Sequence, residues 1–410
     1  MKLRFLAATL ALGSAAIAFT IHAQKGPSSG PIARYDMRAG TQSGFGGMGG
    51  KGGMMSMMMG GGGNQVQHEL LLRLGSSSAA TGAPKADHFM PAGARLGKSV
   101  ALTTPKMEPA YEEWKGEKPK GRLLLYWGCG EHAPKGQPVV LDFAKMAAGQ
   151  FPPGLWTTSI PVDFGPSSTN SKTFGHWPSD DGKSAKPDSS LVGAHRIAGN
   201  YSPEINFTLT RDFMHPLSIS TAAQQSGASL LTWRTIPDVT GFIATLIGGK
   251  QAGGGMGDMV MWTSSANRQF GGGLTDWLSP GQVAPLVRDG TLMGPQVTRC
   301  IVPAEVTRDT PDYRVGTLAA FGPEEDFSYP ARPADPKARW DLQWTARVRH
   351  RSTTNWMEAQ GMSMGTANSS MGQQGQSGQP GQPPKKECKK KGGMFGGLAG
   401  AVLGGGSGGC

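Results

Sequence analysis

The four cysteines are the residues best suited to covalent chemistry. They are Cys129, Cys300, Cys388 and Cys410, and four cysteines allow three pairings. Cys129 ends one apolar run, and Cys300 lies within another, "VTRCIVP". We expect a structural disulfide between these two, which would close a long loop and contribute about 2–4 kcal/mol to stability. Cys388 and Cys410 flank the tail and could pair with each other or with another chain.

The motif "CGEH" is a candidate for half of a metal site. It places Cys129, Glu131 and His132 within four residues. No second Cys or His pair stands at ligand spacing, and other histidines are solitary: His176, His195 and His215. A disulfide or a buried thiol therefore explains Cys129 better than a metal does. A cysteine nucleophile served by His132 is weaker still, because adjacency along the chain seldom gives the required geometry. We predict no catalytic residue.

A methionine run could bind copper. The segment "MMSMMM" supplies five thioethers, at Met54, Met55, Met57, Met58 and Met59. Thioethers are soft ligands that favour Cu(I). These methionines are adjacent rather than spaced, however, and no His or Cys joins them. A low-complexity linker is the alternative interpretation. Copper is the only cofactor that the sequence raises.

The segment "ARWDLQWTARVRHR", residues 338–351, alternates apolar and polar side chains. A period of two predicts a strand with one buried face and one solvent face. The expected inward residues are Trp340, Leu342, Trp344, Ala346 and Val348. Arg347, Arg349 and Arg351 would then face outward, either to guard a sheet edge or to form a cationic row for an anionic polymer or a lipid head group.

Short strands dominate the rest of the foldable region. Apolar or alternating runs, each bounded by Gly, Pro, Asn or Ser, occupy residues 68–74, 121–128, 204–210, 229–233, 241–249 and 258–264. Only short helical turns are predicted, one after Asp142 and one from Pro285 to Gly290. We therefore expect a mainly β protein, with two antiparallel β-sandwich-like units and a few short helices.

The segment "LLTWRTIPDVTGFIATL", residues 230–246, places Trp233 before a Pro-Asp turn and Phe242 after it. This resembles the passage between two strands of fibronectin type III and related immunoglobulin-like β-sandwich domains. The resemblance implies that Trp233 lies between two sheets, and that the domain binds or spaces rather than catalyses.

Two segments share a pattern that suggests a duplicated unit. "GRLLLYW" from Gly121 and "GDMVMWT" from Gly257 both read Gly, a charged residue, three apolar residues and an aromatic. Each is followed by a polar loop, a Gly-Gln pair and a candidate short helix. We accordingly expect two related domains, residues 64–200 and residues 201–356. Chance remains the alternative, since apolar strands after Gly are common.

The flanking segments are expected to direct export and attachment. Residues 1–23 have the charged start, apolar stretch and small residues of a secretory signal peptide. Residues 24–63 and 357–384 are low in complexity and are predicted to be linkers. Residues 385–410 combine "KKECKKK" with a Gly at every fourth position, which on a helix gives a glycine zipper. We expect no transmembrane helix in the mature chain and a location in the periplasm, on the outer-membrane surface or outside the cell.

The net charge of +11 is concentrated near the two ends, which is not typical of a dedicated nucleic-acid binder. We expect an exported, non-enzymatic envelope protein whose tail mediates surface or self association. One alternative is an enzyme acting on cell-surface polysaccharide, with a groove lined by some of Tyr126, Trp127, Trp156, Trp177 and Trp262. The other alternative is a periplasmic copper-binding protein that uses the methionine run.

Overall fold

The structure is a computed structural model that describes residues 30–44, 66–105, 121–150, 160, 163, 165–252, 255–269, 272–335, 337–359 and 362–364. This part of the chain is mostly β, with three sheets and short helices, as the sequence predicted. The leader 1–23, the methionines of "MMSMMM", Cys388, Cys410 and the tail 385–410 lie outside the described residues. Within the described residues, no helix combines the length and the apolar character needed to cross a bilayer.

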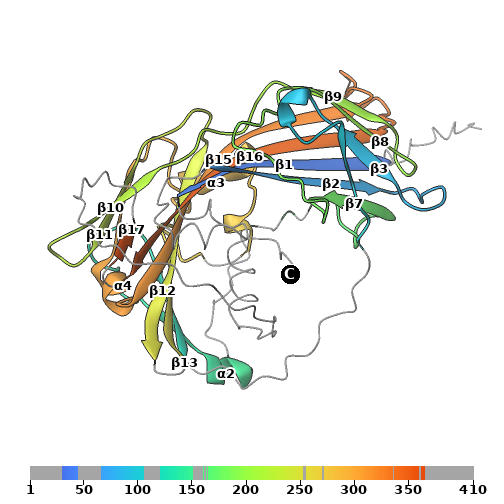
Figure 1. Cartoon of the computed structure of the whole chain (residues 1–410). Coiled ribbons are helices and arrows are strands. Elements are labelled where there is room, and N and C mark those ends of the chain that lie inside the picture. The colour runs from blue at the N-terminus through green and yellow to red at the C-terminus, as the bar shows by residue number, and fades with distance from the viewer. Residues whose placement is uncertain are drawn as a thin grey trace, which may run out of the picture.

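One large sheet runs through the whole molecule. Its strands, in spatial order, are β6 (Val139–Asp142), β5 (Arg122–Trp127), β13 (Gly255–Thr263), β12 (Gly241–Ala252), β15 (Tyr313–Tyr329), β16 (Trp344–Ala359), β1 (Ala33–Gly44), β2 (Gln67–Ser76) and β7 (Thr173–Trp177). Strand β17 (Met362–Met364) pairs with β16. The pairs β1–β16 and β5–β13 are parallel, and the other pairs are antiparallel. The sheet is strongly curved, so it has a concave and a convex face (Figure 1).

Two smaller sheets lie on the convex side (Figure 1). The four-stranded sheet contains β4 (Ser99–Ala101), β3 (Ala86–Phe89), β8 (Gly193–Gly199) and β9 (Ile205–Leu209). The three-stranded sheet contains β10 (Ile219–Ala223), β11 (Ser229–Trp233) and β14 (Arg299–Val302). Each packs on a different stretch of the large sheet, which gives two sandwich-like units. The long strands β15 and β16 belong to both.

The first core lies beneath the four-stranded sheet. It contains Trp344, Ala346 and Val348 of β16, all buried, which confirms this part of the predicted inward face. Trp340 and Leu342 precede the start of β16 and are only partly buried, so the strand was predicted to begin six residues too early. Tyr35 and Met37 of β1 pack beside the three buried residues of β16. The core therefore draws on segments before residue 64 and after residue 201. Strand β1 itself lies within the segment 24–63 that we expected to be a linker.

The second core lies beneath the three-stranded sheet and contains Trp233, which is 5% exposed. Its indole ring lies 5.7 Å from the ring of Phe242, centroid to centroid. Trp233 ends β11 in the small sheet, and Phe242 lies in β12 of the large sheet. Asp238 adopts a positive φ of 62° in the turn between them. The prediction that this turn carries the chain between two sheets around a buried Trp233 is confirmed.

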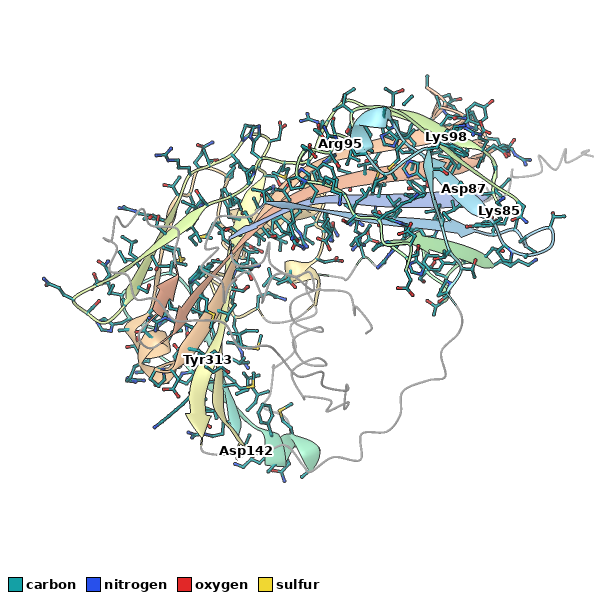
Figure 2. All side chains as sticks on the ribbon, in the orientation of Figure 1. Lys85, Asp87, Arg95, Lys98, Asp142 and Tyr313 are labelled. Atoms are coloured by element: carbon teal, nitrogen blue, oxygen red, sulfur yellow. A yellow bond between two sulfur atoms is a disulfide. The ribbon has the colours of Figure 1, made fainter. Side chains whose placement is uncertain are left out.

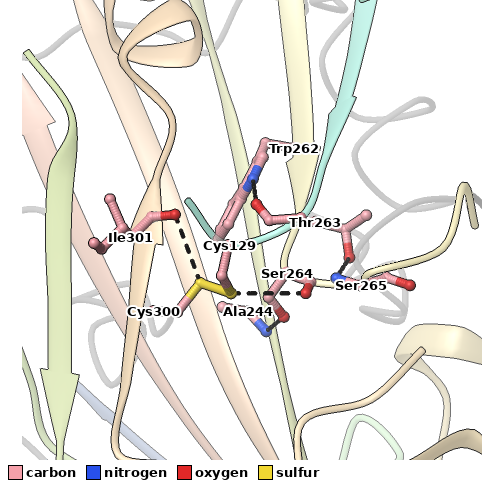
Figure 3. Close-up of a disulfide and its surroundings, with 9 residues drawn as sticks. Cys129, Ala244, Trp262, Thr263, Ser264, Ser265, Cys300 and Ile301 are labelled. Atoms are coloured by element: carbon pink, nitrogen blue, oxygen red, sulfur yellow. Dashed lines mark hydrogen bonds between the residues drawn. A yellow bond between two sulfur atoms is a disulfide. The ribbon is translucent and has the colours of Figure 1, made fainter. Parts of the chain in front are cut away.

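The predicted disulfide also joins the two sheets of this unit. Cys129 follows the end of β5 and Cys300 lies in β14, with their Cα atoms 5.2 Å apart. The indole of Trp262 packs beside the bridge and donates its N–H to the carbonyl of Gly128 (Figure 3). Cys129 and Cys300 come from the two segments that we expected to form separate domains, residues 64–200 and 201–356, but the bridge lies within one sandwich-like unit.

The two echoing segments are neighbours in the large sheet. The parallel pairing of β5 with β13 sets Leu123 opposite Met259 and Tyr126 opposite Trp262, which is the alignment of the two sequence patterns. Arg122 and Asp258, the charged residues of the two patterns, form a salt bridge. The segments therefore do not belong to separate units, and the prediction of one in each of two related sandwiches is wrong.

Short helices complete the fold. Helix α2 (Phe143–Ala147) begins after Asp142, as predicted. The carboxylate of Asp142 accepts hydrogen bonds from two backbone N–H groups of the helix. Helix α3 (Pro280–Arg288) begins five residues earlier than expected, because Ser279 and Gln282 form a capping box. Together with η3 (Gly272–Thr275), α3 covers the middle of the concave face. The remaining helices are η2 (Ala92–Ala94) and α4 (Ala304–Asp309).

Candidate functional site: charge cluster, polar cavity and groove

The concave face of the large sheet carries charged side chains at its centre. The parallel register of β1 and β16 sets Asp36 opposite Arg347 and Arg38 opposite Arg349. All four side chains lie on the same face, because these positions alternate with the core residues of the two strands. With Asp163 and Asp276 from covering segments, they form what we call the arginine–aspartate cluster: Asp36, Arg38, Asp163, Asp276, Arg347 and Arg349.

Asp36 is the centre of this cluster and is only 1% exposed. Arg349 donates to both carboxylate oxygens, at 3.0 and 3.2 Å, and Arg38 donates from Nε at 2.9 Å. Burial alone would raise the pKa of Asp36, but the charges of Arg349, Arg38 and Arg347 outweigh it and lower that pKa. Asp36 is therefore ionised at neutral pH.

Asp163 and Asp276, from the segments that cover this face of the sheet, balance the positive charge of the cluster's arginines. Asp163 lies 2.7 Å from Nη1 of Arg347 and 3.3 Å from Nη1 of Arg349. Asp276 accepts from Nη1 of Arg38 at 3.1 Å. Arg349 is 1% exposed, and Arg347, whose side chain is 30% exposed, is paired with Asp36 and Asp163, so the expectation that these two residues face water as a cationic row is wrong. The alternation was correct, but the second face of this strand is also covered.

Arg351 is placed differently, beside a small polar cavity. Its guanidinium stacks over the ring of Trp277 at 4.3 Å and donates to the carbonyl of Thr275 at 3.0 Å. Gly40 lies opposite Arg351 on β1, and a Cβ there would lie 3.0 Å from Trp277 and 3.1 Å from Glu69. The glycine therefore lets the Trp277 ring lie close to the sheet.

The polar cavity has a volume of about 140 Å³. Seven of its nine lining residues are polar, and they come from β1, β12, β15, β16 and η3. The lining residues are Gln42, Ile243, Thr245, Thr275, Thr317, Ala319, Arg351, Thr353 and Asn355. The cavity lies between the sheet and the segment that covers it, next to the arginine–aspartate cluster.

A larger hollow lies where β2 extends beyond the end of β7. We call it the edge groove, and its volume is about 840 Å³. It is lined by His68, Glu69, Leu70, Leu71, Leu72, Arg73, Pro105, Pro166, Ser167, Ser168, Thr169, Asn170, Phe174, His176, Trp177, Pro178, Lys183, Ser184 and Ala185. Its size is typical of a ligand pocket. Aromatic, hydroxyl and amide side chains predominate over charges.

An aromatic platform forms one wall of the edge groove. Phe174 and His176 lie two residues apart on β7, so both side chains point to the concave face, and both are half-buried. Their rings are nearly parallel, at 10°, with centroids 5.8 Å apart. Burial and the neighbouring charge of Arg73 lower the pKa of His176. At neutral pH the platform is therefore uncharged.

A hydrogen-bonded chain of three side chains is buried in the first core. Nε2 of His195 lies 2.7 Å from the carbonyl of Leu191 and must donate to it. Nδ1 of a neutral His195 then accepts from Nε2 of His88 at 2.9 Å, and Nδ1 of His88 accepts from the hydroxyl of Tyr35 at 2.7 Å. Burial lowers the pKa of both histidines, most strongly that of His88. Every ring nitrogen has a partner in the neutral form.

The remaining predicted site residues are dispersed. Tyr126 and Trp262 are buried in the second core, so they do not line a groove. Trp177 borders the edge groove, but it is 2% exposed. His132 pairs with Glu305 rather than with a metal partner set, and the described residues contain no cluster of three metal-ligating side chains. Trp156 and the methionine run lie outside the part that the structure describes.

The sequence analysis missed Asp36, Phe174 and the edge groove. A signal for β1 was present, since "ARYDMRAG" alternates apolar with charged residues between positions 33 and 38. No comparable signal marked the groove, because its residues come from four separate stretches of chain. Comparison with protein-family models and with curated proteins finds no match to this chain.

Proposed function

We propose that this chain is an exported, non-enzymatic binding protein of the cell envelope that holds a segment of polysaccharide in the edge groove. The observation that carries the proposal is the aromatic platform of Phe174 and His176 inside a groove of about 840 Å³. Flat aromatic faces stack on the apolar faces of sugar rings, and hydroxyl and amide side chains satisfy sugar hydroxyls. Ser167, Thr169 and Asn170, which also line the groove, supply such groups.

The edge groove has too few carboxylates for glycoside hydrolysis, which favours a binding function. Most glycosidases need two carboxyl groups that flank the scissile bond. Among the described lining residues, only Glu69 carries a carboxylate. Export follows from the leader-like residues 1–23, and attachment to the envelope follows from the basic tail 385–410. The fibronectin type III resemblance of residues 230–246 supports the same kind of function, since such domains usually bind or space.

The proposal is tested by affinity electrophoresis of the full chain in gels that contain dextran, xylan or alginate, and by co-sedimentation with peptidoglycan sacculi. We expect retardation or co-sedimentation with at least one of these polymers. Phe174→Ala with His176→Ala should abolish it, whereas Phe89→Ala, which removes a half-buried aromatic of β3 outside the groove, should not. Release of new reducing ends would instead favour the polysaccharide-degrading enzyme. Equal binding by all variants would exclude the groove.

A further inference from the structure

The small polar cavity beside Arg351 lies outside the edge groove and has a different chemistry. We propose that it binds a small hydroxy acid, whose carboxylate pairs with the guanidinium of Arg351. Four strands of the sheet and η3 converge on this cavity, so it is formed by the most regular part of the fold. The proposal does not depend on what occupies the edge groove.

The first argument is charge. The side chain of Arg351 is 11% exposed, and its carboxylate partner, Oε2 of Glu69, lies 3.7 Å from Nη2. That oxygen already accepts from Nε2 of Gln42 at 3.1 Å. By contrast, Arg347 and Arg349 have carboxylate oxygens within 2.7 and 3.0 Å. A buried guanidinium is costly unless an anion pairs with it at hydrogen-bond distance, so Arg351 has capacity for a further anion.

The second argument is geometry. The stacking of Arg351 on Trp277 at 4.3 Å and its bond to the carbonyl of Thr275 hold the guanidinium in one plane. A planar guanidinium in a fixed orientation matches the two oxygens of a carboxylate. Because Arg351 lines the cavity, part of this group faces the space that a ligand would occupy.

The third argument is the rest of the lining. Thr245, Thr317 and Thr353 supply hydroxyls, and Gln42 and Asn355 supply amides. These groups both donate and accept hydrogen bonds, as the hydroxyl of a hydroxy acid requires. A volume of about 140 Å³ holds about five non-hydrogen atoms, if each is given the volume of about 30 Å³ that one water molecule occupies in the liquid. Glycolate fits this limit, whereas citrate, which is more than twice as large, exceeds it.

The test is isothermal titration of the full chain at pH 7 with glycolate, with ethylene glycol and citrate as controls. We expect binding of glycolate with a dissociation constant of about millimolar or tighter, and no binding of either control. Arg351→Gln should weaken binding at least tenfold, or about 1.4 kcal/mol. Arg122→Gln, at an exposed arginine of β5, is the matched control and should leave it unchanged.

Two further variants keep the test decisive if Arg351→Gln does not fold. Thr317→Val and Thr353→Val remove single hydroxyls from the cavity with little change of shape, and each should weaken glycolate binding several-fold. Thr232→Val on β11 removes a hydroxyl outside the cavity and should have no effect. Failure to bind glycolate, or equal binding of ethylene glycol, would overturn the proposal. Binding that survives all three cavity variants would do the same.

Discussion

The carboxylate of Asp36 is 1% exposed and has three guanidinium groups around it. Arg349 is equally buried and gives Asp36 two of its hydrogen bonds. Removing the charge of Asp36 or Arg349 leaves a buried partner with less compensating charge and almost no contact with water. Single substitutions in the arginine–aspartate cluster are therefore expected to lower the free energy of unfolding strongly.

We predict that Asp36→Asn lowers the free energy of unfolding by about 3–5 kcal/mol, because it removes the central carboxylate and leaves the buried Arg349 with Asp163, at 3.3 Å, as its remaining carboxylate partner. Urea denaturation followed by tryptophan fluorescence measures the loss. Asp188→Asn is the control, since its pair with Arg95 is 58% and 59% exposed and should be worth less than about 1 kcal/mol. Equal losses in the two variants would show that the cluster is solvated.

The buried histidines predict a dependence of stability on pH. Burial holds the pKa of His88 and His195 below the ordinary value near 6.5 that both regain on unfolding. The unfolded chain therefore binds more protons, so stability is complete above pH 6.5 and is lost as pH falls through 6.5 towards the lowered folded-state values. Unfolding in urea at pH 8, 7, 6 and 5 measures this, and His88→Gln with His195→Gln should flatten the profile. Nitrogen-15 spectra showing both native rings titrating near 6.5 would contradict it.

At this scale the sequence predicted side-chain alternation but not what covers each face. A period of two places Arg347 and Arg349 opposite Val348 whatever lies above them. Arg347 and Arg349 are covered by segments that carry Asp163 and Trp277, which contact them and are distant from them in sequence. The buried state of these arginines was therefore beyond what a local pattern can show.

Strands β15 and β16 connect the two sandwich-like units, and their close pairing depends on a glycine. Gly316 lies opposite Trp356, and a Cβ at Gly316 would lie 2.0 Å from Cζ2 of that indole. Trp356 is 2% exposed and cannot swing away. The absence of a side chain at residue 316 lets the ring lie flat against the neighbouring strand.

We predict that Gly316→Ala destabilises the protein by about 1–3 kcal/mol, because the added methyl group forces Trp356 out of its place. Thermal unfolding followed by circular dichroism measures the effect. Gly281→Ala in α3 is the control, since a Cβ there meets nothing closer than 3.8 Å and alanine favours a helix. A neutral Gly316→Ala would mean that the two strands are not packed through this contact.

Individual strands were predicted correctly where the sequence has a strong local pattern. Which strands pair with each other was not predicted. The apolar runs 121–128 and 258–264 were predicted to be strands from their local pattern and the residues that bound them. Their parallel pairing with each other was not predicted, because strand order is set by contacts between residues far apart in the sequence. The pattern shared by the segments from Gly121 and Gly257 did indicate a relationship between them. The two segments pair as neighbouring strands of one sheet rather than belonging to two duplicated units.

At the scale of the whole molecule, one curved sheet serves both units. Charged residues such as Lys85 and Lys98 lie near one end, and Asp142 lies near the other (Figure 2). The long strands β15 and β16 each extend from the first core to the second, with one register shift in their pairing between Phe321 and Glu324. We therefore expect the two units to unfold together. Such sharing could not be predicted from sequence, since the boundary between residues 200 and 201 rested on a local pattern shared by two short segments.

The Cys129–Cys300 bridge spans a sequence separation of 171 residues and joins the large sheet to the three-stranded sheet. We predict that Cys129→Ser with Cys300→Ser lowers the free energy of unfolding by about 2–4 kcal/mol, because the unfolded chain loses a long loop closure. Peptide mapping by mass spectrometry without reducing agent checks the pairing in the unaltered protein. Pairing of either cysteine with Cys388 or Cys410 would contradict it.

The central claim is that the edge groove holds a polysaccharide. Hydroxyl-radical footprinting, with and without the polymer that retards the protein most strongly, tests it directly. We predict protection of Phe174 and His176 in the platform and of the lining residues Ser167–Asn170, while the control aromatic Phe89 keeps its reactivity. Protection elsewhere with an unchanged platform, or no protection at any residue, would contradict the account.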